Sequence, residues 1–326
     1  MQNSSVLSNK KILITGGAGF IGSNLIEKLI NQKNEIVCLD NLSTGNIKNI
    51  KPFLNNTNFK FIEGDIINLQ TCETACKGIE IILHQAALGS VARSIKEPQN
   101  IHEVNSTGFL NMLVAARNNN VRRFVYASSS AVYGDADYSP KIEEKIGSAL
   151  SPYAITKYTN ELYAKNFNYL YGLKTIGLRY FNVFGKNQNP DGEYAAVFPK
   201  FIKLIINKEQ PIIFGDGSQS RDFTYIDNVL IANELAATTQ NKNAISNIFN
   251  IGYGETNTLL FLTKKIIEII SKYIPEIKNI ELSFGPERLG DIKNSCASIK
   301  KAQEILNYYP KINVIEGLEK YISEFF

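Results

Sequence analysis

The stretch Ile12-Leu-Ile-Thr-Gly-Gly-Ala-Gly-Phe-Ile-Gly22 decides the fold of this chain. Its three leading apolar residues predict a short buried strand, and a turn of small residues follows them. Apolar side chains then recur at helical spacing as far as Leu29, so a helix is expected from about Gly19. Gly16, Gly19 and Gly22 would permit a tight turn, close approach of a pyrophosphate and close packing of helix on strand. The pattern predicts a dinucleotide-binding turn whose free N–H groups face the phosphates.

An acidic residue follows where such a domain needs one. The apolar run 35–39 predicts a second strand, and Asp40 comes directly after it, 18 residues past Gly22. A carboxylate at this point binds the adenosine ribose hydroxyls of the dinucleotide. It would also repel a 2′-phosphate, so the sequence favours NAD over NADP.

Strands and helices alternate through the first half of the chain. Strands are expected at 59–62, 79–83, 123–127 and 174–179, and helices at 99–118 and 152–171. This alternation predicts an α/β fold with a Rossmann-type, doubly wound parallel sheet. Ligands of such sheets bind beyond the carboxyl ends of the strands. Polar residues follow several of these strands, namely Asp40, Asp65, Gln85 and Ser128 to Ser130.

The pattern changes after residue 182. A polar loop is expected at 185–194, helices at 198–206, 259–273 and 299–306, and short strands at 211–214 and 280–284. We therefore expect a smaller, discontinuous α/β domain that closes over the sheet. The predicted division assigns 1–182 and 222–251 to an NAD-binding domain, and 183–221 and 252–326 to a substrate domain.

Composition excludes several functional classes. The chain has 326 residues, 44% of them hydrophobic, and its net charge of +4 comes from scattered lysines, which argues against a nucleic-acid surface. It has neither an N-terminal apolar signal core nor a run of about 18 apolar residues, so no membrane span is expected. Four cysteines without a C-x-x-C pair, and only two histidines, argue against a metal site. The expectation is a cytoplasmic protein with reduced thiols.

A tyrosine and a lysine suggest chemistry on the helix at 152–171. Tyr153 and Lys157 are four residues apart and share one helix face. An ammonium beside a phenol, together with a positive nicotinamide ring, favours the phenolate, which can remove a proton from a sugar hydroxyl. Ser129, at the end of a predicted strand, would hydrogen-bond the same oxygen, and Ser130 is a second candidate.

Longer stretches resemble one family over nearly the whole chain. The glycine turn, the serine cluster before Val132-Tyr-Gly134, Tyr153-Ala-Ile-Thr-Lys157 and Arg179-Tyr-Phe-Asn182 resemble the extended short-chain dehydrogenases/reductases. Within these, His84-Gln-Ala-Ala-Leu-Gly-Ser-Val-Ala-Arg-Ser94 is similar to UDP-sugar 4-epimerases, most of all to the UDP-N-acetylglucosamine 4-epimerases of bacterial surface-polysaccharide (O-antigen) pathways. The chain departs from these relatives at Ala92, where they have proline, and at Ala131-Val132, where they have serine or threonine before the tyrosine.

The resemblance implies NAD-dependent inversion at C4 of a UDP-sugar through a 4-keto intermediate. It favours the conversion of UDP-GlcNAc into UDP-GalNAc, with the interconversion of UDP-Glc and UDP-Gal as a further reaction. The implied catalytic residues are Tyr153, Lys157, Ser129 and Ser130. The implied cofactor-binding residues are Gly16, Gly19, Phe20, Ile21, Gly22, Asp40, Asn41, Ser43, Thr44, Gly45, Asp65, Ile66, Gln85, Ala86, Ala87, Asn105, Tyr153, Lys157, Tyr180 and Val183. The implied substrate-binding residues are Gly89, Ser90, Ser129, Ser130, Tyr153, Asn182, Gln188, Ala196, Val197, Phe214, Arg221, Arg288, Asp291 and Ser295.

The resemblance also assigns roles on the substrate side. Asn182, Arg221 and Arg288 would hold the diphosphate, because arginine offers a planar, permanently charged donor fork. Asp291 would bind the uridine ribose and Phe214 the uracil. Ser295 aligns with a pocket-wall position at which a small residue accompanies N-acetylated substrates.

The resemblance further implies a homodimer. Helices 99–118 and 152–171 would pair with their symmetry mates in a four-helix interface.

Three alternatives remain open. A 4-epimerase of UDP-N-acetylhexosaminuronic acid would differ by a single carboxylate contact. A sugar-nucleotide 4,6-dehydratase needs an Asp–Glu pair after the serine or threonine position, where this chain has Ser130-Ala131. A non-catalytic NAD-binding protein is disfavoured by the intact Tyr153, Lys157 and Ser129.

Overall fold

The computed structural model describes residues 7–191, 196–287 and 294–326. Its centre is a seven-stranded sheet in the order β11-β6-β5-β4-β1-β2-β3, in which all pairs are parallel. The strands are β1 (Lys11–Thr15), β2 (Glu35–Asp40), β3 (Phe59–Glu63), β4 (Ile81–His84), β5 (Arg123–Ser129), β6 (Thr175–Tyr180) and β11 (Ile248–Ile251). The expected doubly wound parallel sheet is confirmed.

Alternate side chains of the strands enter two separate cores. Ile12 and Ile14 of β1 pack in one cluster with Leu25 of α1 (Phe20–Ile30), and this cluster also contains residues of α9 (Ile226–Thr238). Leu13, between them, packs in the other cluster with Phe109 of α6 (Gly108–Asn118). That second cluster also contains residues of α3 (Leu69–Cys76) and α7 (Pro152–Tyr171). The period of two along β1 therefore explains why helices cover both faces of the sheet.

The helix expected at 99–118 is interrupted. It runs as α5 (Pro98–His102), a π-helical turn (Glu103–Thr107) and then α6. The π turn buries the Asn105 side chain against α7. By contrast, α7 has the expected bounds, and the Ser151 hydroxyl caps it by accepting the Ala154 N–H at 3.1 Å.

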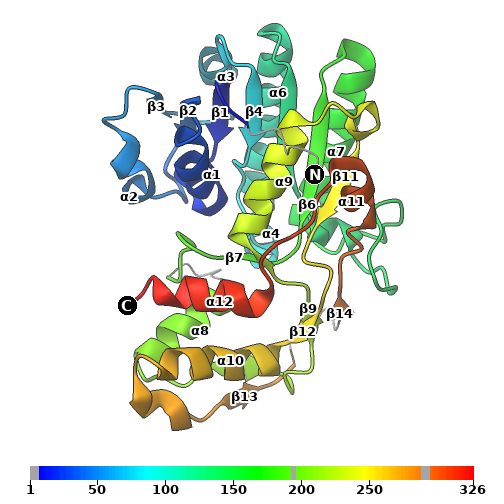
Figure 1. Cartoon of the computed structure of the whole chain (residues 1–326). Coiled ribbons are helices and arrows are strands. Elements are labelled where there is room, and N and C mark those ends of the chain that lie inside the picture. Colours follow the sequence, from blue (N-terminus) through cyan, green and yellow to red (C-terminus); the bar gives the residue numbers. More distant parts are fainter. Residues whose placement is uncertain (1–6, 192–195, 288–293) are drawn as a thin grey trace.

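A smaller group of elements lies beyond the sheet, and Figure 1 shows α8, α10 and α12 gathered there. Its helices are α8 (Val197–Ile206), α10 (Leu259–Ser271) and α12 (Val314–Ser323). Its strand pairs are β7 (Val183–Phe184) with β10 (Thr224–Tyr225), and β8 (Ile212–Phe214) with β13 (Ser283–Gly285). A third small sheet joins β12 (Asn257–Thr258), β9 (Ser220–Arg221) and β14 (Asn294–Ser295).

The remaining elements are short or connect the two groups. The helices are α2 (Ile47–Ile50), α4 (Val91–Lys96) and α11 (Lys300–Leu306), and 3-10 turns lie at Lys51–Phe53, Ser130–Tyr133, Lys242–Ala244 and Pro275–Asn279. α11 contacts β11 and α9, so residues 300–306 pack with the large sheet, although the predicted division assigned them to the substrate domain. Across the three described ranges, no helix is long and apolar enough to cross a membrane. The cytoplasmic location stays a prediction.

Candidate active site

The glycine turn after β1 is shaped by backbone contacts. Gly16 has φ +66°, and a Cβ there would lie 2.7 Å from the Ala86 nitrogen at the end of β4. A Cβ on Gly22 would lie 2.2 Å from the Gly16 carbonyl oxygen, so only glycine lets α1 start this close to the turn. Gly19 precedes α1, and no side chain caps this helix. The first N–H groups of α1 are therefore left for an anion.

Asp40 is fixed at the carboxyl end of β2. Its Oδ2 accepts the Ala18 N–H at 2.9 Å and its Oδ1 accepts the Leu42 N–H at 2.8 Å. Burial raises the pKa of this carboxyl group, and the two backbone N–H groups act in the opposite direction. Both oxygens keep acceptor capacity, so the side chain can still bind a pair of hydroxyl groups.

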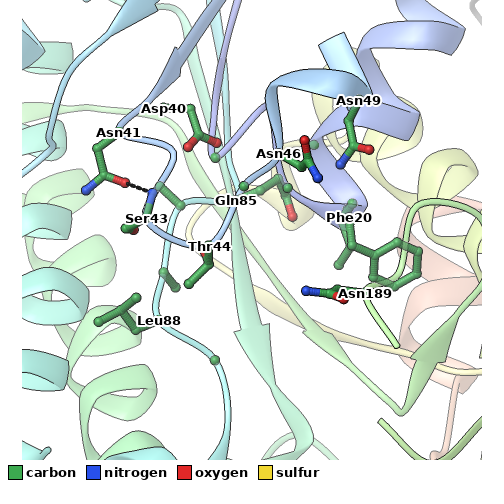
Figure 2. Close-up of a pocket in the computed structure, with 18 of the residues that line it drawn as sticks. Phe20, Asp40, Asn41, Ser43, Thr44, Asn46, Asn49, Gln85, Leu88 and Asn189 are labelled. Carbon is green, nitrogen blue, oxygen red and sulfur yellow. Dashed lines mark hydrogen bonds between the residues drawn. The ribbon is translucent and has the colours of Figure 1, made fainter. Parts of the chain in front are cut away.

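A cavity of about 960 Å³ runs along this edge of the sheet. This volume is within the range of small-molecule and cofactor sites. Figure 2 shows Asp40, Asn41 and Gln85 around it, with Phe20 and Asn189 on one side of the view. The predicted residues that line it are Gly16, Gly19, Phe20, Ile21, Gly22, Asp40, Asn41, Ser43, Thr44, Gly45, Asp65, Ile66, Gln85, Ala86, Ala87, Gly89, Ser90, Gln188 and Ala196.

Polar side chains in the same wall are held by one another. Asn41 Nδ2 donates to Asp65 Oδ2 at 2.6 Å. A closed ring of three hydrogen bonds joins Gln85, Tyr180 and Asn233, with donor–acceptor distances of 3.2, 2.9 and 3.2 Å. This ring ties the end of β4 to β6 and α9, and it fixes the orientation of the Gln85 amide beside the cavity.

Asn105 is not among the residues that line the cavity. Its amide accepts the Leu88 N–H at 2.7 Å and donates to the Leu88 carbonyl at 3.0 Å. It also donates to Thr156 Oγ1 at 3.3 Å, on the helix that carries Tyr153. Through these contacts, Asn105 joins Leu88 in the cavity wall to α7. Its expected direct contact with the cofactor stays a prediction.

The end of β5 and one face of α7 bring the predicted catalytic residues together. Ser129 forms a hydrogen bond with the Tyr153 hydroxyl group. Lys157 Nζ donates to the Ala127 carbonyl oxygen at 2.8 Å and lies 5.9 Å from the centre of the Tyr153 ring. Ser130 begins the 3-10 turn that follows β5. The cavity lining does not include Tyr153, Lys157, Ser129, Ser130 or Tyr180. Tyr180 is joined to the cavity wall by its bond to Gln85, and α7, which carries Tyr153 and Lys157, is joined to it by the bond from Asn105 to Thr156.

Two influences act on the pKa of Tyr153. Burial is the larger one and raises the pKa of Tyr153, and the hydrogen bond from Ser129 opposes it. Burial also lowers the pKa of Lys157 to about 8. The Lys157 ammonium group donates to the Ala127 carbonyl oxygen. The expected lowering of the Tyr153 pKa by Lys157 together with a nicotinamide ring stays a prediction.

On the substrate side, pairing of short strands assembles residues that are far apart in sequence. Ser295 of β14 lies beside Arg221 of β9 in parallel register. Asn182, which has φ +33°, donates to the Asp222 carbonyl oxygen at 2.8 Å. The Asp222 carboxylate is fully buried and accepts N–H groups of Tyr253 and Gly254, each at 2.9 Å. Sequence reasoning missed Asp222, which joins the segments that carry Asn182, Arg221 and Ser295.

Two other predicted substrate residues and one predicted cofactor residue are separate from this group. The substrate residues Phe214 and Val197 lie on β8, in a different sheet, and on α8. The predicted cofactor residue Val183 lies on β7. None of these six residues (Asn182, Val183, Val197, Phe214, Arg221 and Ser295) lines the cavity along the sheet edge. Arg288 and Asp291 fall outside the described residues.

Several lining residues were missed by the sequence reasoning. Asn46 and Asn49 are held at the cavity by the Ala18 carbonyl oxygen. The Asn46 backbone N–H and the Asn49 side-chain Nδ2 both donate to it at 2.9 Å. Asn187 lies on the expected polar loop, and its Nδ2 donates to Ser23 Oγ at 3.0 Å on α1. Only the abundance of asparagine in these loops pointed to them. The further lining residues are Leu39, Gly64, Leu88, Arg93, Val104, Asn189, Pro190 and Asp191.

Comparison with known families matches residues 12–252 to the model for the NAD dependent epimerase/dehydratase family. The chain belongs to this family. A curated relative named putative UDP-glucose 4-epimerase, from Methanocaldococcus jannaschii, is 38% identical over 314 residues, which cover 96% of this chain and 97% of the relative. The extended short-chain dehydrogenase/reductase resemblance is therefore confirmed.

Solved structures of similar proteins share the whole fold of this family member. The UDP-N-acetylglucosamine 4-epimerase from Methanobrevibacter ruminantium, in complex with UDP-N-acetylmuramic acid, is 37% identical with a TM-score of 0.89, and the match covers 98% of this chain and 99% of the other. The UDP-glucuronic acid 4-epimerase from Bacillus cereus, in complex with UDP-glucuronic acid and NAD, is 31% identical with a TM-score of 0.86, covering 97% and 100%.

The cofactor of this family member is NAD. The residues present fit it: the crowded glycines leave room for a pyrophosphate at the uncapped start of α1, and the Asp40 carboxylate lies at the end of β2. Within residues 7–191, 196–287 and 294–326, no three His, Cys, Asp or Glu side chains are grouped to hold a metal ion.

Proposed function

We propose that this protein is a UDP-N-acetylglucosamine 4-epimerase that forms UDP-GalNAc and that also interconverts UDP-Glc and UDP-Gal. The comparisons support the broader activity, NAD-dependent 4-epimerisation of a UDP-sugar. One observation carries the narrower choice. The small, partly buried Ser295 lies in register beside Arg221, and we assign it to the wall where an acetamido group needs space. The similar Methanobrevibacter enzyme, named for UDP-N-acetylglucosamine, supports the same choice.

In the proposed reaction, Tyr153 removes the proton of the sugar 4-hydroxyl and later returns it. Ser129, bonded to the Tyr153 hydroxyl, orients the same oxygen. Lys157 holds its ammonium next to the ring at 5.9 Å and stabilises the phenolate once it forms. Bound NAD supplies a hydride acceptor at C4 that also returns the hydride, so that it is not consumed. Because burial raises the Tyr153 pKa, positive charge near the phenol is required for this proton transfer.

On the substrate side, we assign the diphosphate to Asn182 and Arg221, which the β9–β14 pairing and the Asn182–Asp222 bond place in one group. Arg288 and Asp291 would add a second diphosphate contact and a ribose contact. Phe214 would contact the uracil. Between removal and return of the hydride, the 4-keto sugar makes one half-turn about its diphosphate and presents the opposite face of C4, so the configuration at C4 is inverted.

The test is incubation of the purified protein with UDP-GlcNAc, UDP-Glc, UDP-GlcA and UDP-N-acetylglucosaminuronic acid, with products identified by NMR. We expect UDP-GalNAc from UDP-GlcNAc with the highest kcat/KM. Turnover of the uronic forms alone would contradict the proposal. Absence of turnover with every UDP-sugar, in protein that holds NAD, would favour the non-catalytic alternative.

A uronic acid substrate is the second candidate, because the Bacillus cereus neighbour at 31% identity is named for UDP-glucuronic acid. A C6 carboxylate needs a cationic or multiple-donor partner that a C6 hydroxyl does not. Competition between UDP-GlcNAc and UDP-GlcA in one reaction separates the two. A preference for UDP-GlcA would decide for this candidate.

We further propose a homodimer. Ile155, Leu162 and Leu170 form an exposed apolar stripe on α7, and Ile95 on the contacting helix α4 is 65% exposed. A symmetric copy would cover this stripe in a four-helix interface of α7 and the 98–118 helix. Light scattering at micromolar concentration should give twice the chain mass. Leu162→Glu should give the monomer mass, whereas Lys165→Glu, a charge reversal on the same helix, should not.

The product gives this activity a place in the cell. UDP-GalNAc is an activated sugar, and we propose that it supplies surface-polysaccharide (O-antigen) synthesis. Loss of GalNAc from the surface polysaccharide of a strain that lacks this chain, with recovery on re-expression, would support the assignment.

A further inference from the structure

Three consecutive residues at the end of β5 contact α7 at three successive turns. The Ala127 carbonyl accepts Lys157 Nζ at 2.8 Å, the Ser128 hydroxyl donates to Glu161 Oε1 at 2.5 Å, and Ser129 bonds Tyr153. The α7 residues 153, 157 and 161 are spaced four apart and share one helix face. The contacts at 127 and 129 belong to the proposed chemistry. The middle contact, from Ser128 to Glu161, has no role in it so far.

Glu161 is part of a buried and fully hydrogen-bonded network. Arg179 of β6 binds it with two hydrogen bonds, Nε to Oε1 and Nη2 to Oε2, both at 2.8 Å. The two side chains are only 3% and 2% exposed. Arg179 Nη1 donates to the Glu143 carbonyl at 3.0 Å, and the guanidinium lies 4.9 Å from the centre of the Tyr133 ring. Isolated buried ion pairs rarely add net stability, so a satisfied pair one turn from Lys157 calls for another explanation.

We propose that Glu161, held by Ser128 and Arg179, is a positioning residue: it fixes the alignment of α7 on the end of β5 and supports the buried Lys157 ammonium beside Tyr153. This proposal rests on the proposed function, since it assigns Glu161 to the same Tyr153–Lys157 site. Glu161 itself acts through Lys157 and is not a catalytic residue.

The charges around Lys157 set the sign of the effect. On α7, Glu161 and Tyr153 are the neighbouring titratable groups, and at the end of β4 it is His84. Tyr126 of β5 and Arg179 of β6 interact with Glu161 in turn. Burial and the Lys157 charge lower the pKa of His84 to about 3, and burial raises the pKa of Tyr126, so neither titrates near neutral pH. Burial lowers the pKa of Lys157 to about 8, and the Glu161 carboxylate opposes this. Removing that carboxylate must lower the Lys157 pKa further.

The pH profile of kcat is the first readout. Phenolate stabilisation needs the protonated Lys157, so kcat should fall as pH rises through the Lys157 pKa. We compare the wild type with Glu161→Gln/Arg179→Met, which removes both buried charges together and so avoids an uncompensated ion. The alkaline limb of kcat should move to lower pH by about one unit, and kcat at pH 7 should fall severalfold. Lys10→Met/Glu80→Gln, which removes a half-buried ion pair at the opposite end of the sheet, is the matched control and should change neither.

Glu161→Asp separates charge from geometry. It keeps the carboxylate but shortens the side chain, so that Ser128 and Arg179 can no longer both be reached. We expect the alkaline limb to stay within a few tenths of a pH unit of the wild type while kcat falls. If circular dichroism shows that the double variant is unfolded, the kcat of Glu161→Asp tests the proposal instead. An unchanged kcat overturns the positioning role, and a lowered kcat with an unshifted alkaline limb supports it.

A second readout is independent of turnover. Lys157 has a lower pKa in the folded chain than the usual 10.5, so the free energy of unfolding rises with pH between about 8 and 10.5. This contribution is complete above 10.5 and is lost as pH falls through 8. Subtracting the unfolding free energy of Lys157→Met from that of the protein that keeps Lys157, at each pH, isolates this rise. In the double variant, the rise should begin about one pH unit lower.

These readouts keep the two proposals apart. If the wild type converts no UDP-sugar, the proposed function fails, and the unfolding measurement still tests Glu161. An unchanged alkaline limb together with an unchanged onset of the Lys157-dependent rise, in a folded double variant, overturns the role of Glu161 even in an active enzyme.

Discussion

The two sides of the candidate active site are built in different ways. On the dinucleotide side, the contacts that shape the turn lie within one strand–turn–helix unit and the neighbouring strand ends, as with Gly22 against Gly16 and Asp40 against Ala18. On the proposed sugar side, Asn182, Arg221 and Ser295 come from separate segments that are joined by the β9–β14 pairing and the buried Asp222. A cofactor shared by a large family can thus be held by a short local motif. The residues to which we assign the sugar nucleotide depend instead on the pairing of short strands.

The largest expected effect lies between the two sides, at Tyr153. Tyr153→Phe keeps the ring but removes the hydroxyl that moves the proton, so kcat should fall on the order of a hundredfold or more. NAD content, measured after denaturing the protein, should not change. Tyr169→Phe on the same helix, where the side chain is 85% exposed, should behave as wild type. Turnover close to normal in Tyr153→Phe would remove this residue from the chemistry.

A change on the sugar side should alter the choice of substrate without affecting the cofactor. In Ser295→Tyr, the larger ring fills the space beside Arg221, and overpacking of this kind costs about 1–3 kcal/mol. UDP-GlcNAc/UDP-GalNAc interconversion should therefore fall about five- to 150-fold in kcat/KM relative to UDP-Glc/UDP-Gal. The assay follows both pairs with the same preparation.

The outcomes for Ser295 are distinct. Equal losses for both pairs, with a lowered unfolding temperature, would indicate a folding defect in β14. Equal activity on both pairs would show that Ser295 does not form the pocket wall.

A change on the dinucleotide side should alter the cofactor without changing the order of sugar preference. Asp40→Asn removes the negative charge while its Oδ1 can still accept one of the two backbone N–H groups. Loss of a charge-assisted hydrogen bond to the ribose should weaken NAD about tenfold, by roughly 1.5 kcal/mol. The repulsion of a 2′-phosphate should also be reduced, so the ratio of NADP to NAD affinity should rise. Cofactor released from the wild type should be NAD(H), and recovery of mainly NADP(H) would contradict the role of Asp40.

The strands, the glycine turn and the helix that build the dinucleotide side could be predicted from the sequence because their signals are local. Spacing placed the glycines, Asp40 and the exact bounds of α7, and the structure confirms the parallel sheet that these elements build. The π turn inside 98–118 was missed, because hydrophobic periodicity over a long run does not reveal one extra residue. Asp222 and Asn187 were missed because their partners are distant in sequence. The upward influence of burial on the pKa of Tyr153 was missed because burial depends on packing that no motif encodes.

The π turn at 103–107 has a consequence for insertions and deletions. A wide turn takes up one extra residue, which in a regular helix would rotate everything that follows by about 100°. Deleting one residue there would restore a regular turn, leave α6 in phase and keep Phe109, Met112 and Leu113 in the core. The loss would fall on Asn105, whose side chain this turn holds against Leu88 and Thr156. A deletion within the regular turns of α6 would instead rotate the remaining residues of that helix out of the core.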